Sequence, residues 1–167
     1  RGIQYDLPMA SAQVKSAVLL AALFAEGETV VTEPGAARDH TERMLRAMGV
    51  DVAVEGNKVT IQPTRTLRPM DFTIPGDASS AAFPVVAALI IPDSDITLTN
   101  INLNPTRTGL FDVLREMGAD LTITETGTKA GDPVGTIRAR HSPLKGVTVG
   151  GEVVVRMIDE FPIFMVA

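Results

Sequence analysis

The segment Leu45-Arg-Ala-Met-Gly-Val-Asp51 returns later in the chain as Leu114-Arg-Glu-Met-Gly-Ala-Asp120, and this repeat decides the fold. A second match lies upstream of each copy, where Ala21-Ala-Leu23 and Ala87-Ala-Leu89 stand in apolar stretches. Each apolar stretch precedes a segment in which apolar and polar residues alternate, as in a strand. The chain therefore contains a repeated block of helix, strand, helix, strand, strand, and its class is α/β.

The apolar pattern of the first block predicts a buried helix, a strand, a second helix and a hairpin at residues 12–25, 28–32, 39–48 and 50–62. Gly27 ends the first helix, because glycine tolerates left-handed geometry. Asp39-His-Thr-Glu42 has the spacing of a capping box, in which the Glu42 side chain would accept a hydrogen bond from the backbone N–H of Asp39. Glu55-Gly-Asn57 separates two alternating segments and predicts the turn of the hairpin.

The second block predicts a strand, a helix, a strand, a helix and two closing strands at residues 72–74, 77–90, 96–100, 108–117, 119–124 and 136–140. Residues 125–135 are rich in Gly and Thr, so we expect a long mobile hairpin loop there. A third block begins near Val153, since Phe161-Pro-Ile163 echoes Phe83-Pro-Val85. We expect three segments, a repeat unit at 1–69, a second at 70–150 and the truncated start of a further unit at 151–167, with a hinge within residues 69–76.

Composition excludes several classes of function. The net charge of −5 argues against nucleic acid and against an acidic membrane surface as partners. The chain has no Cys, which excludes disulfides and thiolate metal sites, and its two histidines, His40 and His141, are too distant in sequence to suggest a metal site. Its apolar runs are shorter than the roughly 20 residues that span a bilayer, and its first residues do not resemble a signal peptide. We expect a cytoplasmic protein.

The two ends predict a longer protein. The sequence begins at Arg1 without Met, and it stops at Ala167 within the apolar run that starts at Phe161. An apolar stripe needs a partner that buries it, so we expect the chain to be an internal fragment. Its unfilled faces would allow self-association through exposed apolar surface.

The sharpest candidate site is Met9-Ala-Ser-Ala-Gln13. Ser11 stands where the N-cap of the buried helix should be, and the N–H groups that follow it have no partner within a helix. Together with the helix dipole they form a site for an anion, to which Ser11 and Gln13 add side-chain donors. The alternative is that Ser11 only caps the helix.

Two further places could carry chemistry. Arg38 precedes the second predicted helix and is either a surface salt-bridge residue or a phosphate ligand, because guanidinium binds phosphate in a bidentate fork. Asp159 and Glu160 precede the third-block helix and either cap it or interact favourably with its dipole, or they supply a general base. Gly76-Asp-Ala-Ser-Ser80 predicts a capped turn rather than a phosphate loop. We interpret the remaining basic residues as solvated charges. They include Lys15, Arg107, Arg138 and Arg140.

Motifs along the whole chain resemble, in order, the 5-enolpyruvylshikimate-3-phosphate synthase family, and most closely its bacterial branch with glyphosate-tolerant enzymes. The motifs are Leu7-Pro-Met-Ala-Ser-Ala-Gln-Val-Lys-Ser-Ala17, Arg38-Asp-His-Thr-Glu42, Pro75-Gly-Asp-Ala-Ser-Ser80, Asn104-Pro-Thr-Arg-Thr-Gly109 and Met157-Ile-Asp-Glu-Phe-Pro162. The resemblance implies the enolpyruvyl transferase fold, an inside-out α/β barrel of βαβαββ units, which would be incomplete here. Two lobes of three units each close on substrate, and the chain would contribute to both.

The family transfers the enolpyruvyl group of phosphoenolpyruvate to the 5-hydroxyl of shikimate 3-phosphate, without a metal or organic cofactor. The resemblance places Ser11, Ala12, Gln13 and Arg38 on shikimate 3-phosphate, with Gln13 also near phosphoenolpyruvate. It makes Asp159 both a ligand of the shikimate ring hydroxyls and the proton acceptor. The family's other Lys, Arg and Glu ligands fall outside the chain, so we expect no useful rate from the chain alone.

Two other functions remain open. The sister family transfers enolpyruvyl to UDP-N-acetylglucosamine and shares the fold and the donor, but the Ser-Ala-Gln and Arg-Asp-His-Thr segments favour the shikimate branch. The chain could also act as a non-catalytic α/β repeat module that binds partners through exposed faces.

Overall fold

The first block folds as the sequence pattern requires, with six elements in the order βαβαββ. The computed structural model describes all residues, 1–167. The elements are β1 (Gln4–Asp6), α1 (Ala12–Ala22), β2 (Thr29–Thr32), α2 (His40–Ala47), β3 (Val52–Glu55) and β4 (Lys58–Ile61). The strands form one sheet in the order β1-β2-β4-β3, in which β1 and β2 are parallel and the other pairs antiparallel.

From its first helix onward, the second block repeats this topology. Its elements are α3 (Ala78–Ile90), β5 (Asp95–Asn102), η1 (Pro105–Arg107), α4 (Gly109–Glu116), β6 (Asp120–Lys129), β7 (Asp132–Arg140), α5 (Glu152–Arg156), η2 (Ile158–Glu160) and α6 (Phe161–Phe164). The sheet order β5-β7-β6 matches β2-β4-β3 of the first block. The predicted α/β class and its βαβαββ repeat are confirmed.

The strand predicted at residues 72–74 is wrong. Only an isolated parallel bridge between Gly76 and Ile101 stands where the first block has the β1–β2 pair. Phe72, Thr73 and Ile74 are exposed, so this stretch lacks the buried face that stabilises a strand.

The mobile loop predicted at residues 125–135 is also wrong. Strands β6 and β7 continue through it and pair from Asp120–Arg140 to Lys129–Asp132, with a register shift between Glu125 and Gly127. Ala130 and Gly131 form the tight turn, both with positive φ. The threonines in this stretch favour extended backbone, and the glycines are absorbed by the shift and the turn.

Two details of the first block differ from the sequence prediction. Helix α1 ends at Ala22 rather than at Ala25, although Gly27 does take a positive φ of 98°. The capping box at residues 39–42 is absent. Asp39 is the N-cap of α2 but makes no side-chain cap hydrogen bond, and Glu42 is buried in the unit instead.

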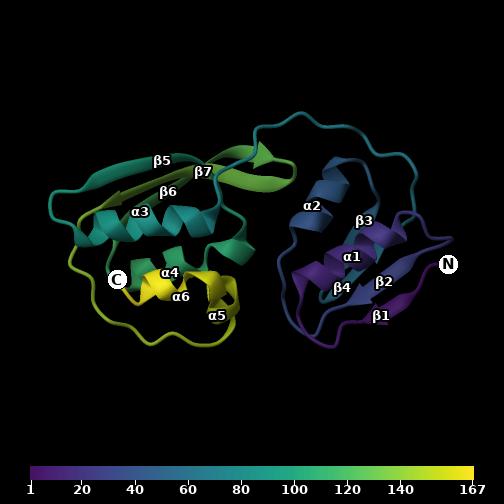
Figure 1. Cartoon of the computed structure of the whole chain (residues 1–167), viewed down its shortest axis with the longest axis horizontal. Helices are drawn as coiled ribbons and strands as arrows, with labels where there is room; N and C mark the ends of the chain where they lie inside the picture. The colour runs from purple at the N-terminus through teal and green to yellow at the C-terminus, as the bar shows by residue number, and fades with distance from the viewer. The chain divides into compact units, whose positions relative to one another are not determined.

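The chain divides into two compact units, Arg1–Phe72 and Thr73–Ala167 (Figure 1). In the first unit, α1 and α2 pack on the sheet around a core that includes Leu19, Val31, Leu45, Val59 and Ile61. In the second unit, α3 and α4 pack on the sheet, and the core includes Leu89, Phe111, Leu114, Ile137 and Met157. Residues 151–167 pack against this second core through Val153, Phe161, Ile163, Phe164 and Ala167. The division into three segments at 1–69, 70–150 and 151–167 stays a prediction.

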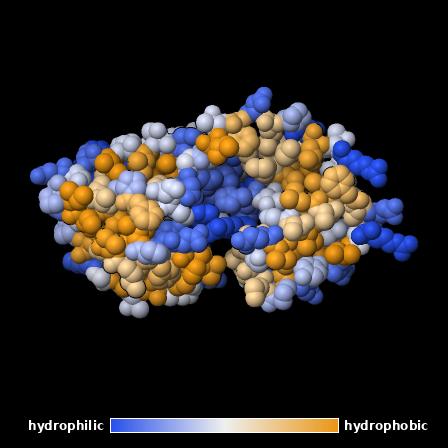
Figure 2. All heavy atoms as spheres, in the orientation of Figure 1, coloured by the Kyte–Doolittle hydropathy of each residue, from blue (hydrophilic) through white to orange (hydrophobic).

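Each unit also exposes apolar side chains, as the face shown in Figure 2 illustrates. They include Leu20 and Phe24 in the first unit and Ile74 and Phe83 in the second. No helix combines the length and apolar character that a membrane-spanning segment needs.

Candidate functional site

The first turn of α1 has the geometry of the predicted anion site. Ser11 is the N-cap, with an extended backbone (φ −145°, ψ 109°), and its Oγ accepts a hydrogen bond from the N–H of Val14 at 3.3 Å. Ser11 and Ala12 are half-buried, and Gln13 is exposed. The N–H groups of Ala12 and Gln13 have no intrahelical partner, so they can receive an anion. The capping role is confirmed, and the binding role stays a prediction.

Arg38 lies in the segment that leads into α2 and is half-buried. Helices α1 and α2 are neighbours near this point, because the hydroxyls of Ser16 and Thr41 are 2.7 Å apart. The predicted ligands of shikimate 3-phosphate therefore belong to adjacent helix starts of one unit, and they are Ser11, Ala12, Gln13 and Arg38.

The second unit shows what an arginine at this repeat position can do. Arg107 precedes Leu114 by seven residues, as Arg38 precedes Leu45, and Asp77 caps α3 as Ser11 caps α1. The Nη2 of Arg107 donates to Asp77 Oδ1 at 2.9 Å. An arginine before the second helix of a block thus reaches the N-terminus of the first helix. The prediction of Arg107 as a solvated charge is wrong, since its side chain is only 15% exposed.

The carboxylate of Asp77 is held as an anion at this helix terminus. Partial burial alone would raise its pKa, but the hydrogen bonds from Ser80 and the charge of Arg107 outweigh burial, and the pKa is lowered from the ordinary value. Asp77 Oδ2 accepts from the N–H of Ser80 at 2.9 Å. The capped turn predicted at residues 76–80 is confirmed.

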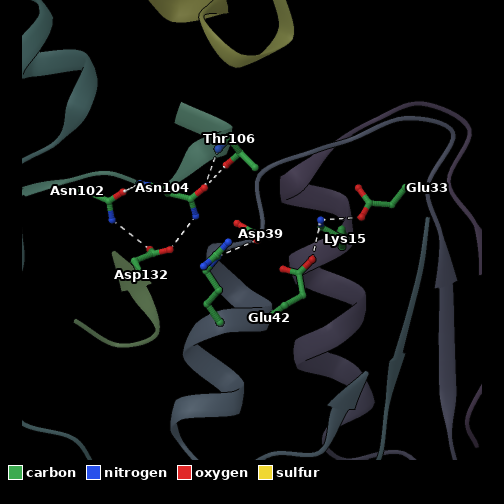
Figure 3. Close-up of polar contacts among 9 residues, drawn as sticks. Lys15, Glu33, Asp39, Glu42, Asn102, Asn104, Thr106 and Asp132 are labelled. Carbon is green, nitrogen blue, oxygen red and sulfur yellow. Dashed lines mark hydrogen bonds and ion pairs between the residues drawn. The ribbon is translucent and has the colours of Figure 1, made fainter. Parts of the chain in front are cut away.

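A buried ionic cluster lies one turn beyond Ser11 (Figure 3). Lys15 is 1% exposed, and its Nζ lies 2.8 Å from Glu33 Oε1 and 2.7 Å from Glu42 Oε1. The Oε2 atoms of both glutamates are buried without a hydrogen-bond partner. The cluster joins α1, the end of β2 and α2, so it fixes the two helix starts that carry Ser11 and Arg38.

Sequence reasoning missed this cluster, because it read Lys15 as solvated and Glu42 as part of a cap. One signal was available. Lys15 shares the buried face of α1 with Leu19 and Ala22, and Glu42 shares that of α2 with Leu45. A charge on an otherwise apolar face requires a buried partner of opposite charge.

A second polar network lies within the second unit and holds the turn between β6 and β7 (Figure 3). Asp132 Oδ1 accepts from Asn104 Nδ2 at 2.7 Å, and its Oδ2 accepts from Asn102 Nδ2 at 3.1 Å. Asn104 is fully buried, and its Oδ1 caps η1 by accepting from the N–H of Thr106 at 2.8 Å. These contacts order the stretch that was predicted to be a mobile loop.

Asp159 and Glu160 belong to η2 and face different surroundings. Asp159 is exposed, whereas Glu160 is 4% exposed and accepts a hydrogen bond from the Ser79 hydroxyl. Glu160 stands at the N-cap position of α6 but makes no side-chain cap bond, so the alternative in which it caps this helix is wrong. Asp159 lies in the second unit, and Ser11, Gln13 and Arg38 lie in the first.

The other candidates are surface features. Arg138 and Arg140 are half-exposed and pair with Asp95 and Asp120 at 2.6 Å and 2.7 Å. A shallow groove along α1 is lined mainly by apolar residues, among them Val14, Ala17 and Ala21, with Gln13 also among the lining residues. No group of three or more His, Asp or Glu side chains gathers in a geometry that could hold a metal ion.

A family model and curated relatives both match this chain and carry the same description. The family model described as EPSP synthase (3-phosphoshikimate 1-carboxyvinyltransferase) matches residues 1–167. A 3-phosphoshikimate 1-carboxyvinyltransferase of Geobacter sp. (strain M21) is 53% identical over 166 residues, which cover 99% of this chain and 39% of the relative. One from Caulobacter vibrioides (strain NA1000 / CB15N) is 55% identical over 175 residues, covering 100% of this chain and 40% of the relative.

Solved structures agree. EPSP synthase from Acinetobacter baumannii superposes with a TM-score of 0.91 at 52% identity, over 97% of this chain and 37% of that one. The enolpyruvyl transferase NikO from Streptomyces tendae superposes with a TM-score of 0.59 at 19% identity, over 84% of this chain and 35% of that one, and shares the fold. The chain spans about two fifths of the length of the curated relatives it matches.

Proposed function

Because the chain belongs to the EPSP synthase (3-phosphoshikimate 1-carboxyvinyltransferase) family, we propose that it is part of an enzyme with that activity. The enzyme would move the enolpyruvyl group of phosphoenolpyruvate to the 5-hydroxyl of shikimate 3-phosphate and release phosphate. The chain would contribute the site for the 3-phosphate from its first unit and the proton acceptor Asp159 from its second.

The comparison between the two repeat units carries this proposal. In the second unit, the place at the N-terminus of the first helix is filled by an internal anion, the Asp77 carboxylate, which Arg107 and the N–H of Ser80 hold. In the first unit the equivalent cap is Ser11, which brings no negative charge. The same framework, with Arg38 at the position of Arg107, is therefore suited to an anion supplied by a ligand.

A phosphate group fits this place better than a carboxylate does. A phosphate can accept from backbone N–H groups, from the Ser11 hydroxyl and the Gln13 amide, and from a guanidinium at the same time. Ala12 lacks a long side chain that could cover the helix end. These features support shikimate 3-phosphate as the ligand of Ser11, Ala12, Gln13 and Arg38.

Asp159 suits a role as proton acceptor because it is a carboxylate residue at an exposed position of η2. We also propose a cytoplasmic location, because multiply charged phosphorylated substrates do not cross membranes unaided. Nucleic acid is not among the proposed partners. Self-association of the chain through exposed apolar residues such as Leu20 and Phe24, and membership of the glyphosate-tolerant branch, are further parts of the proposal.

Replacement of Arg38 tests the phosphate site in the full-length protein. We expect Arg38→Ala to weaken shikimate 3-phosphate binding roughly ten- to a hundredfold, as befits the loss of a charge-assisted contact of about 1.5–3 kcal/mol. Phosphoenolpyruvate binding should weaken less. Isothermal titration with each ligand measures both effects.

Arg65→Ala is the matched control, because it removes the same charge from an exposed position after β4. Binding of both ligands should stay within about twofold, since charges exposed to solvent are screened over a Debye length of about 8 Å. If Arg38→Ala weakens both ligands equally, the assignment fails. Phosphate release with UDP-N-acetylglucosamine in place of shikimate 3-phosphate would favour the sister activity.

A further inference from the structure

The Asp77-Ala-Ser-Ser80 segment does more than cap a helix. Asp77 and Ser80 form the cap itself, with Ser80 donating to Asp77 through its N–H and its hydroxyl. The side chain of Ser79 takes no part in that cap, although its backbone N–H also hydrogen-bonds to the Asp77 carboxylate. Its hydroxyl donates to Glu160 Oε1, which lies 81 residues further along the chain in η2.

Arg107 determines the direction of the Ser79 hydrogen bond. Its Nη2 donates to Ser79 Oγ as well as to Asp77 Oδ1. A guanidinium can only donate, and a serine hydroxyl has a single hydrogen. The Ser79 hydrogen is therefore committed to the Glu160 carboxylate, which is 4% exposed and has to be satisfied inside the unit.

A second anchor lies before η2 in the sequence. Arg156, at the end of α5, donates to the carbonyl oxygen of Pro105 at 2.7 Å and to Asp112 Oδ2 at 2.6 Å. Gly109 makes this close approach possible, because a Cβ built there would lie 2.9 Å from Arg156 Cβ. Arg156 and Glu160 bracket Asp159, and both are tied to η1, Glu160 through Ser79 and Arg107.

We propose that Ser79, Arg107 and Glu160 are positioning residues that hold η2 so that the exposed Asp159 carboxylate keeps a fixed place. This inference rests on the proposed function of Asp159 as proton acceptor. Ser79 and Arg107 stand at the repeat positions of Gln13 and Arg38. Their role in the second unit would nevertheless differ from the ligand binding proposed for Gln13 and Arg38. In the second unit the helix terminus and its arginine bind an internal carboxylate and orient a neighbouring residue instead of a ligand.

The test compares the two serines in the full-length protein. Ser79→Ala removes the hydrogen bond to Glu160, and we expect kcat to fall about ten- to a hundredfold, since small misplacements of a reacting group have effects of that size. KM for both substrates should change less than about threefold, because Asp159 would act in the transition state more than in substrate binding. Ser80→Ala is the matched control on the same helix turn, and its kcat should stay within about twofold.

A pair of substitutions with the same shape separates positioning from packing. Ser79→Thr keeps the hydroxyl and should restore kcat to within about threefold, whereas Ser79→Val fills the same volume without a hydroxyl and should behave like Ser79→Ala. Thermal melting of all variants identifies any that do not fold. If Ser79→Ala does not fold, the comparison of Ser79→Thr with Ser79→Val still tests the positioning role.

Asp159→Asn separates this inference from the proposed function. If Asp159→Asn loses turnover while Ser79→Ala and Ser79→Val keep kcat within about twofold, the positioning role is wrong and the proposed function stands. If Asp159→Asn keeps turnover, the proposed role of Asp159 is wrong. Equal kcat for the Thr and Val variants would overturn the positioning role in either case.

Discussion

Lys15 is the residue that departs most from what its type leads one to expect. Lysine is almost never fully buried unless it is paired, and here two glutamates accept from its ammonium group. The cluster has one positive and two negative groups, and the two Oε2 atoms lack partners. Such a cluster stabilises little in comparison with apolar packing, but losing one member leaves an uncompensated buried charge.

We therefore predict that Lys15→Met destabilises the first unit by about 3–5 kcal/mol, because Glu33 and Glu42 would remain buried without a cation. Urea unfolding of the purified chain, followed by circular dichroism, measures the loss. Lys58→Met, at an exposed position of β4, is the control and should change the free energy of unfolding by less than about 0.5 kcal/mol. A triple variant that also carries Glu33→Gln and Glu42→Gln should recover part of the loss. Equal effects at Lys15 and Lys58 would show that the cluster is not maintained in solution.

At the residue scale, local features could be predicted and distant pairings could not. The caps at Ser11 and Asp77 follow from residue type and position, and both are present. The partners of Lys15 lie 18 and 27 residues away, and no spacing rule of a single helix links them. The contact between Arg107 and Asp77 could have been predicted from the repeat, because Arg107 occupies the same repeat position as Arg38.

At the scale of elements, the N-terminus of α3 depends on a charged cap. Asp77 accepts from Ser80 and Arg107, and its pKa is below the ordinary value of 3.8. A carboxylate with a lowered pKa contributes stability above its unfolded-state pKa, and that contribution is lost as the pH falls through the folded-state pKa. Stability from this cap should therefore be complete above about pH 3.8 and decrease in more acidic solution.

Asp77→Asn provides the measurement. Asparagine can still cap the helix but cannot titrate, so it removes only the charge. The difference in unfolding free energy between the original chain and Asp77→Asn should shrink as the pH falls below about 3.8. Asp95, whose pKa is lowered by a hydrogen bond from Arg138, titrates in the same range in both proteins and cancels in the difference. A difference that stays constant with pH would contradict the prediction.

The elements themselves were predictable where apolar periodicity and burial coincide. Helix α3 lies within one residue of its predicted bounds, since its apolar residues fill the core of the second unit. One prediction failed because it was based on glycine content. Residues 125–135 look like a loop, but Asp132 is held by Asn102 and Asn104, and these hydrogen bonds extend the hairpin. No sequence pattern reveals that pairing.

At the scale of the whole molecule, the repeat accounts for two cores within one chain. Each unit has its own cluster of buried apolar residues, and the boundary between Phe72 and Thr73 falls in the segment where the hinge was predicted. Residues 62–75 contain no helix or strand, although Thr64 and Arg68 keep backbone hydrogen bonds to Leu23 and Met48 of the first unit. The hinge itself stays a prediction.

Limited proteolysis tests whether this segment is the weakest part of the backbone. Chymotrypsin should cut first after Leu67 or Phe72, because proteases need a backbone that can leave its regular structure locally. Leu20 supplies an internal control, since it is 50% exposed against 38% for Leu67 but lies within α1. Exposure alone would therefore favour Leu20, whereas local opening favours Leu67. Two stable fragments that end near residue 72 would support two independently folded units. First cleavage after Leu20, or cleavage at many sites at once, would mean that the units do not keep their structure independently, because a unit with a complete core protects its own helices.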